Sequence, residues 1–314
     1  MVNALLINPI YIIGIGLGAA FLIGFFKKGK SFALLVMIAA LAFMAFLSFN
    51  WLFAFLYSGQ QPLEIFTAGF KPPFSINLRM GTEEAFFTFA VNLVGLLGGL
   101  YMLDKLKEKG NHAISVFVVL IMGLDGIIMT RDLFNLFVFL EIASIATAGL
   151  IALSSERKAL GAGFKYMIAT GLISGFLLIG IIFAYYFGGT LNIDTLTSAN
   201  LPALKGGVYA LFLIIIAMTL EMKPFPANGW AIDVYDAAPA GINSIISAAS
   251  AAAAYYALSK ILPMGGTLFM RFIAVAGLVS FIGSNLAGIK QNKAKRLLGY
   301  SSVGQIGLLM IILG

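Results

Sequence analysis

The apolar runs of this sequence contain ionisable side chains, namely Asp125, Glu141, Lys165, Glu221 and Lys223. A charged side chain near the centre of a lipid bilayer costs at least about 2.5 to 3.5 kcal/mol on insertion scales, so each one needs a partner, a water-filled cavity or a function. Carboxyl and amine groups whose protonation states influence each other can pass protons along a path. We therefore take these five residues as candidate ion-translocation groups.

Glu141 lies about ten residues into its apolar run, which is near mid-depth in a membrane. Ser144 is one helical turn after it and Phe137 one turn before it, so a helix would place a polar spot in an aromatic wall. Burial and a nearby cation act on such a carboxyl in opposite senses, which is how a carboxyl becomes a proton relay. The alternative is a static ion pair.

A break in a helix is predicted at Pro224 and Pro226, because two closely spaced prolines remove backbone donors and interrupt helical hydrogen bonding. Broken helices with a charge at the break are typical of intramembrane ion sites. Glu221 and Lys223 precede the break, and their two-residue spacing on a helix predicts that each meets a different neighbour. The alternative for Lys223 is a side chain that extends to the membrane surface.

The sequence around two further candidates, Asp125 and Lys165, gives fewer indications of an ion site. Asp125 lies between Gly123 and Gly126, which would let a helix or water approach, and the alternative is a neutral, hydrogen-bonded structural carboxyl. Lys165 is near the start of its run and is predicted either to pair inward with Glu141 or to extend to the membrane surface.

The elements that hold these residues are membrane spans. The 314 residues are 61% hydrophobic and 11% charged, which excludes a water-soluble fold. We predict an all-α, polytopic membrane protein of about ten transmembrane helices with a broken seventh helix, because runs of about 20 apolar residues recur. The predicted spans are 8–26, 32–56, 85–103, 113–130, 132–153, 161–187, 206–224, 237–261, 268–289 and 298–314.

Most basic loop residues fall on one side of the membrane in this arrangement. Since cytoplasmic loops are enriched in Lys and Arg, that side is predicted to be cytoplasmic, with the N-terminus and the loop 57–84 outside the cell membrane. This distribution explains the net charge of +7 without a nucleic-acid partner. The residues on the predicted cytoplasmic side are Lys27, Lys28, Lys30, Lys105, Lys107, Lys109, Arg157, Lys158, Lys165, Lys290, Lys293, Lys295 and Arg296.

The chain has no cysteine, which excludes disulfides and cysteine-bound iron–sulfur clusters. Its one histidine, His112, is predicted to be a solvated loop residue. We therefore expect no metal, no cofactor and no catalytic residue in this chain, so any redox centre must lie elsewhere.

Two of the predicted helices contain regularly spaced small residues. Gly14, Gly16 and Gly18 are spaced like part of a nucleotide-binding loop but lie in an apolar helix, which favours close helix packing. A serine at every third position from Ser244 to Ser250 gives the predicted eighth span a small face of the same kind.

Three segments together resemble one known family. They are Thr130 to Glu141, Pro226 to Pro239 with its Asp-Val-Tyr stretch, and Lys295 to Gly307. On the basis of these three segments, residues 85–314 resemble the antiporter-like subunits of respiratory complex I (N and M types) and the D-type subunits of Mrp antiporters. They also resemble the related subunits of membrane-bound hydrogenase and sulfane reductase complexes. The resemblance implies that Glu141 is a proton-path residue.

The chain departs from that family at several points. Glu221 stands where the family usually has a lysine, and the positions of Ala251 and Ala252 lack the usual lysine or histidine. Family members continue to about fourteen helices, so the chain resembles a member shortened at its C-terminus. The resemblance implies one transmembrane domain, 1–314, with its N-terminal helices in 1–112, a first five-helix repeat in 113–262 and the start of a second repeat in 263–314.

The resemblance predicts a membrane-arm subunit of an ion-translocating redox complex that relays protons or sodium ions and performs no redox chemistry itself. Its partners would be other membrane subunits, including further antiporter-like subunits. One alternative is a degenerate, non-conducting structural subunit of the same kind of complex. Another is an independent secondary transporter, because broken helices also bind small solutes.

Overall fold

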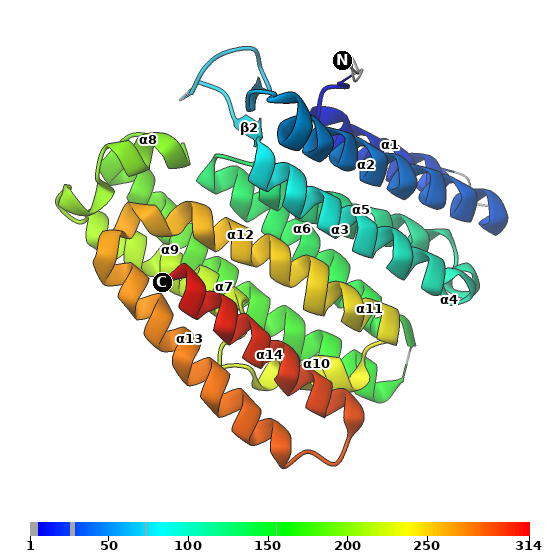
Figure 1. The fold of residues 1–314 in the computed structure, drawn as a ribbon. Coiled ribbons are helices and arrows are strands. Elements are labelled where there is room, and N and C mark those ends of the chain that lie inside the picture. Colours follow the sequence, from blue (N-terminus) through cyan, green and yellow to red (C-terminus); the bar gives the residue numbers. More distant parts are fainter. Residues whose placement is uncertain (1–5, 26–28, 73, 155) are drawn as a thin grey trace.

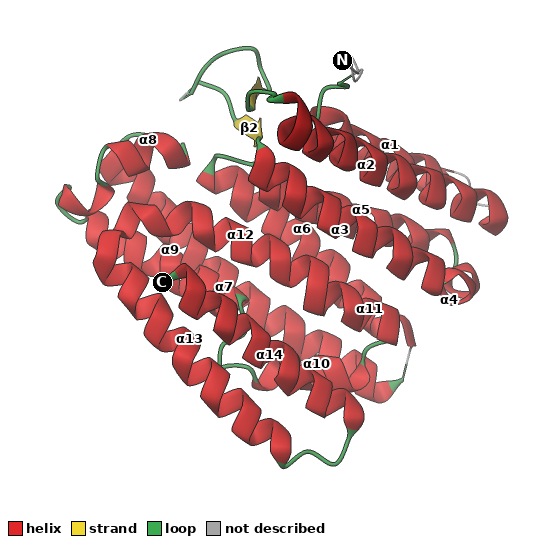
Figure 2. Ribbon diagram, viewed as in Figure 1, coloured by secondary structure: helices red, strands yellow, loops and turns green. Residues whose placement is uncertain are grey.

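The computed structural model describes residues 6–25, 29–72, 74–154 and 156–314, and most of them are helical (Figures 1 and 2). The predicted cytoplasmic residues Lys27 and Lys28 and the first five residues lie outside the described part. The helices are α1 (Ile10–Phe25), α2 (Lys30–Ser58), α3 (Thr82–Tyr101), α4 (Leu103–Lys109), α5 (Asn111–Met129), α6 (Leu133–Ile151), α7 (Arg157–Gly188), α8 (Ile193–Ser198), α9 (Gly207–Glu221), α10 (Gly229–Ala237), α11 (Ala240–Ser244), α12 (Ala251–Ile261), α13 (Gly266–Ile289) and α14 (Ala294–Leu313).

Short 3-10 or π segments join or extend several of these helices. They are η1 (Ala152–Ser154), η2 (Leu201–Ala203), η3 (Ile245–Ser250) and η4 (Leu262–Gly265). The π segment η3 makes α11, η3 and α12 one rod, whereas at η4 the chain reverses into α13 (Figure 1).

The apolar runs form the expected membrane helices. Seven helical segments in the described part are long and apolar enough to cross a membrane, and two shorter apolar helices, α1 and α9, accompany them. One of the seven, residues 240–289, contains the reversal at η4. The all-α membrane fold is confirmed, and the count of about ten spans remains a prediction.

A short hairpin covers the end of the bundle at which α5 stops and α6 starts. Strands β1 (Leu63–Phe66) and β2 (Asn77–Met80) pair antiparallel, and the backbone N–H of Arg131 donates to the Asn77 carbonyl at 3.0 Å. We call this the Arg131 end of the bundle. The opposite end, where α6 stops and α10 lies, is the Asp233 end (Figure 1).

The break after α9 is confirmed. α9 ends at Glu221 and α10 begins at Gly229, so both prolines lie in the connection. Lys223 follows the helix with a φ of 58°, the left-handed conformation that L-residues rarely adopt. The Ser280 hydroxyl of α13 accepts a hydrogen bond from the Phe225 N–H at 3.1 Å, which satisfies one backbone donor freed by the break.

Close packing is confirmed for one of the three N-terminal glycines. A Cβ at Gly16 would lie 2.6 Å from the Met122 Cβ on α5, whereas one at Gly14 or Gly18 would meet no atom within 4 Å. The prediction was wrong for Gly14 and Gly18, which lie on faces of α1 without a close neighbour.

Candidate functional site

A small polar cavity lies between α5, α6, α7, α9 and α12, beside the break. Its volume is about 10 Å³, roughly the space of one water molecule. Glu221 at the end of α9 lines it, and so does Tyr166 of α7, whose side chain hydrogen bonds to Ser144 and Thr147 of α6. The remaining lining residues are Leu124, Ile127, Leu140, Ala143, Ser250 and Ala254. One carboxyl-bearing and four hydroxyl-bearing residues therefore line one cavity inside an apolar bundle.

Two more ionisable residues lie close to this cavity. Glu141 is next to the cavity residue Leu140 on α6, and its charge lies within Coulombic range of Glu221. Lys223, buried with 4% of its surface exposed, is within Coulombic range of Glu221 as well. The expectation that Glu221 and Lys223 meet different neighbours stays a prediction. Its helical reason does not apply, because Lys223 lies beyond the end of α9.

Lys165 is not part of this group. Its ammonium lies 2.6 Å from the Asp233 carboxylate of α10, and its side chain is 60% exposed. The expectation that it pairs inward with Glu141 was therefore wrong. Arg296 of α14 holds the other Asp233 oxygen at 3.1 Å. Burial opposes ionisation of Asp233, but these two cations hold its pKa below the ordinary value.

A second carboxylate, Asp236, extends this ion-pair cluster at the Asp233 end. Lys158 lies 2.9 Å from it and Lys293 3.6 Å, with Arg296 at 3.8 Å. Although burial again disfavours the charged form, the hydrogen bond from Lys158 and the three positive charges lower the pKa of Asp236. The cluster ties α10 to α7 and α14. Sequence reasoning counted these cations only as topology signals and overlooked the two carboxylates of the Asp-Val-Tyr segment.

Asp125 is fully buried on α5 and is held by a different helix. The Asn92 amide of α3 donates to its Oδ1 at 3.1 Å, and its Oδ2 has no hydrogen-bond partner among the described residues. Gly126 does not admit water, because a Cβ there would lie 2.3 Å from the Phe139 ring. Asp125 does not line the cavity that Glu221 faces, although its neighbour Leu124 does.

The Arg131 end holds a charged pocket that sequence reasoning missed. The pocket has a volume of about 400 Å³ and lies between the start of α3, the α5–α6 connection, α8 and the end of α12. The charged residues that line it are Arg79, Glu83, Glu84, Arg131, Asp194 and Lys260. Lys260 lies at the end of the predicted span 237–261 and Arg131 in the segment Thr130 to Glu141, and no local pattern indicates that they converge.

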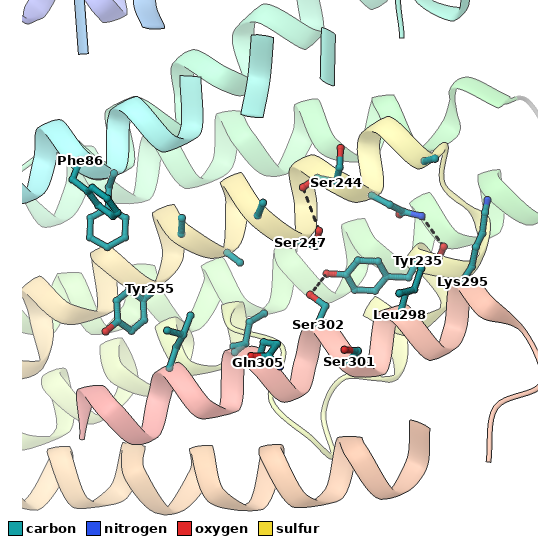
Figure 3. A pocket seen from close by; sticks show the side chains of 18 residues that line it. Phe86, Tyr235, Ser244, Ser247, Tyr255, Lys295, Leu298, Ser301, Ser302 and Gln305 are labelled. Carbon is teal, nitrogen blue, oxygen red and sulfur yellow. Dashed lines mark hydrogen bonds between the residues drawn. The ribbon is translucent and has the colours of Figure 1, made fainter. Parts of the chain in front are cut away.

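A larger and mostly apolar groove runs between α12 and α14 (Figure 3). Its volume is about 760 Å³, and the small residues Ser244, Ser247, Ala251 and Ala252 form one wall. The Tyr235 hydroxyl lies 3.0 Å from that of Ser302 and closes one side. The prediction of close packing for this small face was wrong on the side that faces α14, where the groove lies.

The described residues contain no group of three or more Asp, Glu or His side chains that could hold a metal ion. His112 lies at the start of α5 and is exposed.

Comparison with known proteins agrees with this arrangement. Residues 130–314 match the family described as NADH:quinone oxidoreductase/Mrp antiporter, transmembrane. The chain is 31% identical over 266 residues to NADH-quinone oxidoreductase subunit N of Desulforudis audaxviator, a match that covers 80% of this chain and 52% of the relative. A match to subunit N of Myxococcus xanthus is 28% identical and covers 78% of this chain and 50% of that relative. The chain thus spans about half the length of these curated relatives.

Solved structures of membrane complexes contain chains with the same fold. The fold superposes with a TM-score of 0.91 on a chain of the membrane-bound sulfane sulfur reductase, an archaeal respiratory membrane complex, at 31% identity over 97% of this chain and 64% of that one. A chain of the Mrp complex from Dietzia sp. has the same fold, with a TM-score of 0.88 at 20% identity over 97% of this chain and 58% of that one. The protein therefore belongs to the NADH:quinone oxidoreductase/Mrp antiporter transmembrane family.

Proposed function

We propose that this protein is an antiporter-like membrane subunit of an ion-translocating redox complex and that it relays protons through the bundle. Glu141, Glu221 and Lys223 form the central relay, and Lys165 with Asp233 forms its approach at the Asp233 end. Other membrane subunits of the complex, among them further antiporter-like subunits, are its partners, and the redox chemistry takes place outside this chain.

One observation carries this proposal: a polar cavity lies beside a broken helix, and the carboxyl that lines it interacts electrostatically with a second carboxyl and an amine. Glu221 lines the cavity with Tyr166, and Glu141 and Lys223 lie within Coulombic range of Glu221. Buried ionisable groups without a function are costly in a membrane. A proton relay needs ionisable groups that influence one another's protonation, and charges arranged in this way supply such groups.

The comparisons support the assignment to a complex. The curated relatives are named as subunit N of NADH-quinone oxidoreductase, and the superposed chains come from a sulfane sulfur reductase and an Mrp complex. The distribution of basic residues supports an orientation in the cell membrane with the Asp233 end in the cytoplasm, since Lys158, Lys293 and Arg296 gather there. The N-terminus would then face outward.

A second candidate function is a non-conducting spacer between neighbouring membrane subunits. The wall of the groove at Ala251 and Ala252 supports it, because these positions carry no ionisable side chain. In a spacer, the residues around the cavity would contribute to stability and not to transport.

The variant Glu141→Gln separates the two candidates. In the purified complex reconstituted into vesicles, we expect turnover-driven proton movement, followed with a pH-sensitive dye, to fall at least tenfold while the subunits stay assembled. Glu156→Gln is the control, because Glu156 is exposed at the start of α7. Unchanged proton movement in Glu141→Gln with intact assembly would favour the spacer. An isolated chain that transports a solute on its own would instead support a secondary transporter.

A further inference from the structure

Lys260 makes an unusual set of contacts at the Arg131 end. It lies in the last turn of α12, with 8% of its surface exposed, and its ammonium donates to the carbonyl oxygens of Ile127, Ile128 and Thr130 at 2.9, 2.9 and 2.8 Å. These oxygens belong to the C-terminal turn of α5, where helical carbonyls lack an intrahelical partner and the helix dipole favours a cation. The residue therefore links α12 to α5.

The same ammonium borders the charged pocket of about 400 Å³. It lies 5.2 Å from the centre of the Tyr256 ring, and Tyr256 in turn interacts with Glu84 of α3. Glu84 is buried, accepts a hydrogen bond from the Gly81 N–H at 2.9 Å and lies 3.8 Å from Arg131.

Arg131 continues this chain of charges to the surface. Its guanidinium lies 2.6 Å from Asp194 of α8, whose side chain is 47% exposed. Glu84, Arg131 and Asp194 are also the charged groups that act on Lys260. The other charged residues of the pocket lining are Glu83 and Arg79, which lies 3.9 Å from Glu84. An unbroken series of titratable and charged groups therefore leads from a buried amine to an exposed carboxylate.

On its other side, Lys260 is connected to the central cavity through Ile127 and through its own helix. Ile127, which gives Lys260 one of its three carbonyl oxygens, also lines the cavity that Glu221 faces. Ala254 lines the cavity as well and belongs to the same helix as Lys260, between one and two turns before it. The amine thus lies between the cavity and the charged pocket.

We propose that Lys260 and the charged pocket form the proton passage between the central cavity and the Arg131 end of the bundle. This inference rests on the proposed function. The Lys260 ammonium gives up a proton to water in the pocket, and the Glu84 carboxylate takes up a proton from that water, which leaves a neutral amine and a carboxylic acid. Glu84 then releases the proton to water in the pocket, and the amine takes a new proton from the side of the cavity.

The anchoring of Lys260 is compatible with this cycle. A neutral amine keeps two N–H groups, so it can continue to donate to two of its three carbonyl acceptors after it loses a proton. A lysine amine can exchange protons in this way, whereas an arginine guanidinium stays protonated in proteins. If Lys260 only held α12 against α5, its positive charge would be sufficient for that role.

The variant Lys260→Arg distinguishes a proton relay from a purely structural contact between α12 and α5. It retains a cation with several donors at the α5 carbonyls, so we expect the complex to assemble with near-normal thermal stability and turnover-driven proton movement to fall at least tenfold. Lys107→Arg on α4, where Lys107 is exposed, is the control. Normal proton movement in Lys260→Arg would overturn the proposal.

Glu84→Gln provides an independent test if Lys260→Arg does not assemble. Glutamine can still accept from the Gly81 N–H through its amide oxygen but cannot take up a proton, so we expect the same loss of proton movement with assembly retained. Normal proton movement in Glu84→Gln would overturn the proposal as well.

Access of water to the pocket can be measured in the assembled complex. Because the chain has no cysteine, Ser259→Cys places a single thiol in this chain at the pocket lining. We expect it to react with a membrane-impermeant thiol reagent, whereas Ala253→Cys, at a fully buried position, should not react. A Ser259→Cys thiol as slow to react as that of Ala253→Cys would contradict a passage at this end.

Glu141→Gln, measured in parallel, separates this inference from the proposed function. If Glu141→Gln blocks proton movement and both Lys260→Arg and Glu84→Gln conduct normally, only the passage through Lys260 is wrong. If Glu141→Gln conducts normally, the proposed function fails and this inference fails with it.

Discussion

The Lys165 ammonium lies 2.6 Å from the Asp233 carboxylate and joins α7 to the short helix that follows the break. Together with Arg296 and the cations around Asp236, this pair holds α10 against the ends of two long helices. The break after α9 therefore ends in an anchored segment, which keeps Glu221 and Lys223 in place beside the cavity.

Asp236 should make the stability of the protein sensitive to acid. Its pKa is lower in the folded protein than in the unfolded chain, so its contribution is fully present above about pH 4, the ordinary carboxyl pKa, and is lost as the pH falls through the lower folded value. We expect Asp236→Asn to cost about 1 to 3 kcal/mol at pH 7, because a nearly buried acceptor of a charged hydrogen bond loses its charge.

Thermal unfolding in detergent, recorded between pH 7 and pH 3, checks this. The midpoints of Asp236→Asn and the unchanged protein should differ by a constant amount down to about pH 4 and converge below it. A difference that grows as the pH falls would contradict the assignment. Glu108→Gln is the control, since the Glu108 side chain is 73% exposed.

Lys223→Gly should separate the backbone of the break from its charge. The φ of 58° costs an L-residue roughly 1 to 2 kcal/mol, a strain that glycine does not have. We therefore expect Lys223→Gly to leave the midpoint of thermal unfolding unchanged or higher, while proton movement by the complex falls at least tenfold. Lys223→Ala, which keeps the strain and removes the amine, should lose proton movement as well and unfold at a lower temperature than Lys223→Gly.

The pair of Asn92 and Asp125 should contribute to stability. Asn92→Ala removes the amide that donates to the fully buried Asp125 carboxyl, and we expect a loss of about 1 to 3 kcal/mol, because a buried polar group without its partner is costly. Asp125→Asn retains an oxygen that accepts from Asn92 and should be closer in stability to the unchanged protein. Equal unfolding midpoints for Asn92→Ala and the unchanged protein would show that the hydrogen bond contributes nothing.

The contact between α7 and α9 should depend on Gly180. A Cβ there would lie 3.0 Å from the Ala210 carbonyl oxygen and 3.0 Å from the Ile214 backbone nitrogen, so Gly180→Ala would force the two helices apart. Such overpacking typically costs about 1 to 3 kcal/mol, measured as a lower unfolding midpoint. At Gly175, on the same helix, a Cβ would meet no atom within 4 Å, and Gly175→Ala should be neutral or slightly stabilising. Equal midpoints for the two variants would contradict the packing argument.

The sequence by itself determined that this protein is a bundle of membrane helices with a break at Pro224 and Pro226. Hydrophobic length and the missing proline donor are local properties, so they can be read without knowledge of the fold. The same holds for the recognition of Glu141 as a carboxyl in an apolar helix.

Only the tertiary structure decided which charges meet. Lys165 pairs with Asp233, 68 positions away, and not with Glu141. Lys260, at the end of a predicted span, donates to the Ile127 carbonyl across 133 positions and so becomes a buried contact of α5. The physical reason is that an ion pair depends on distances of a few ångströms between side chains, and the sequence gives no such distance until the helices have packed.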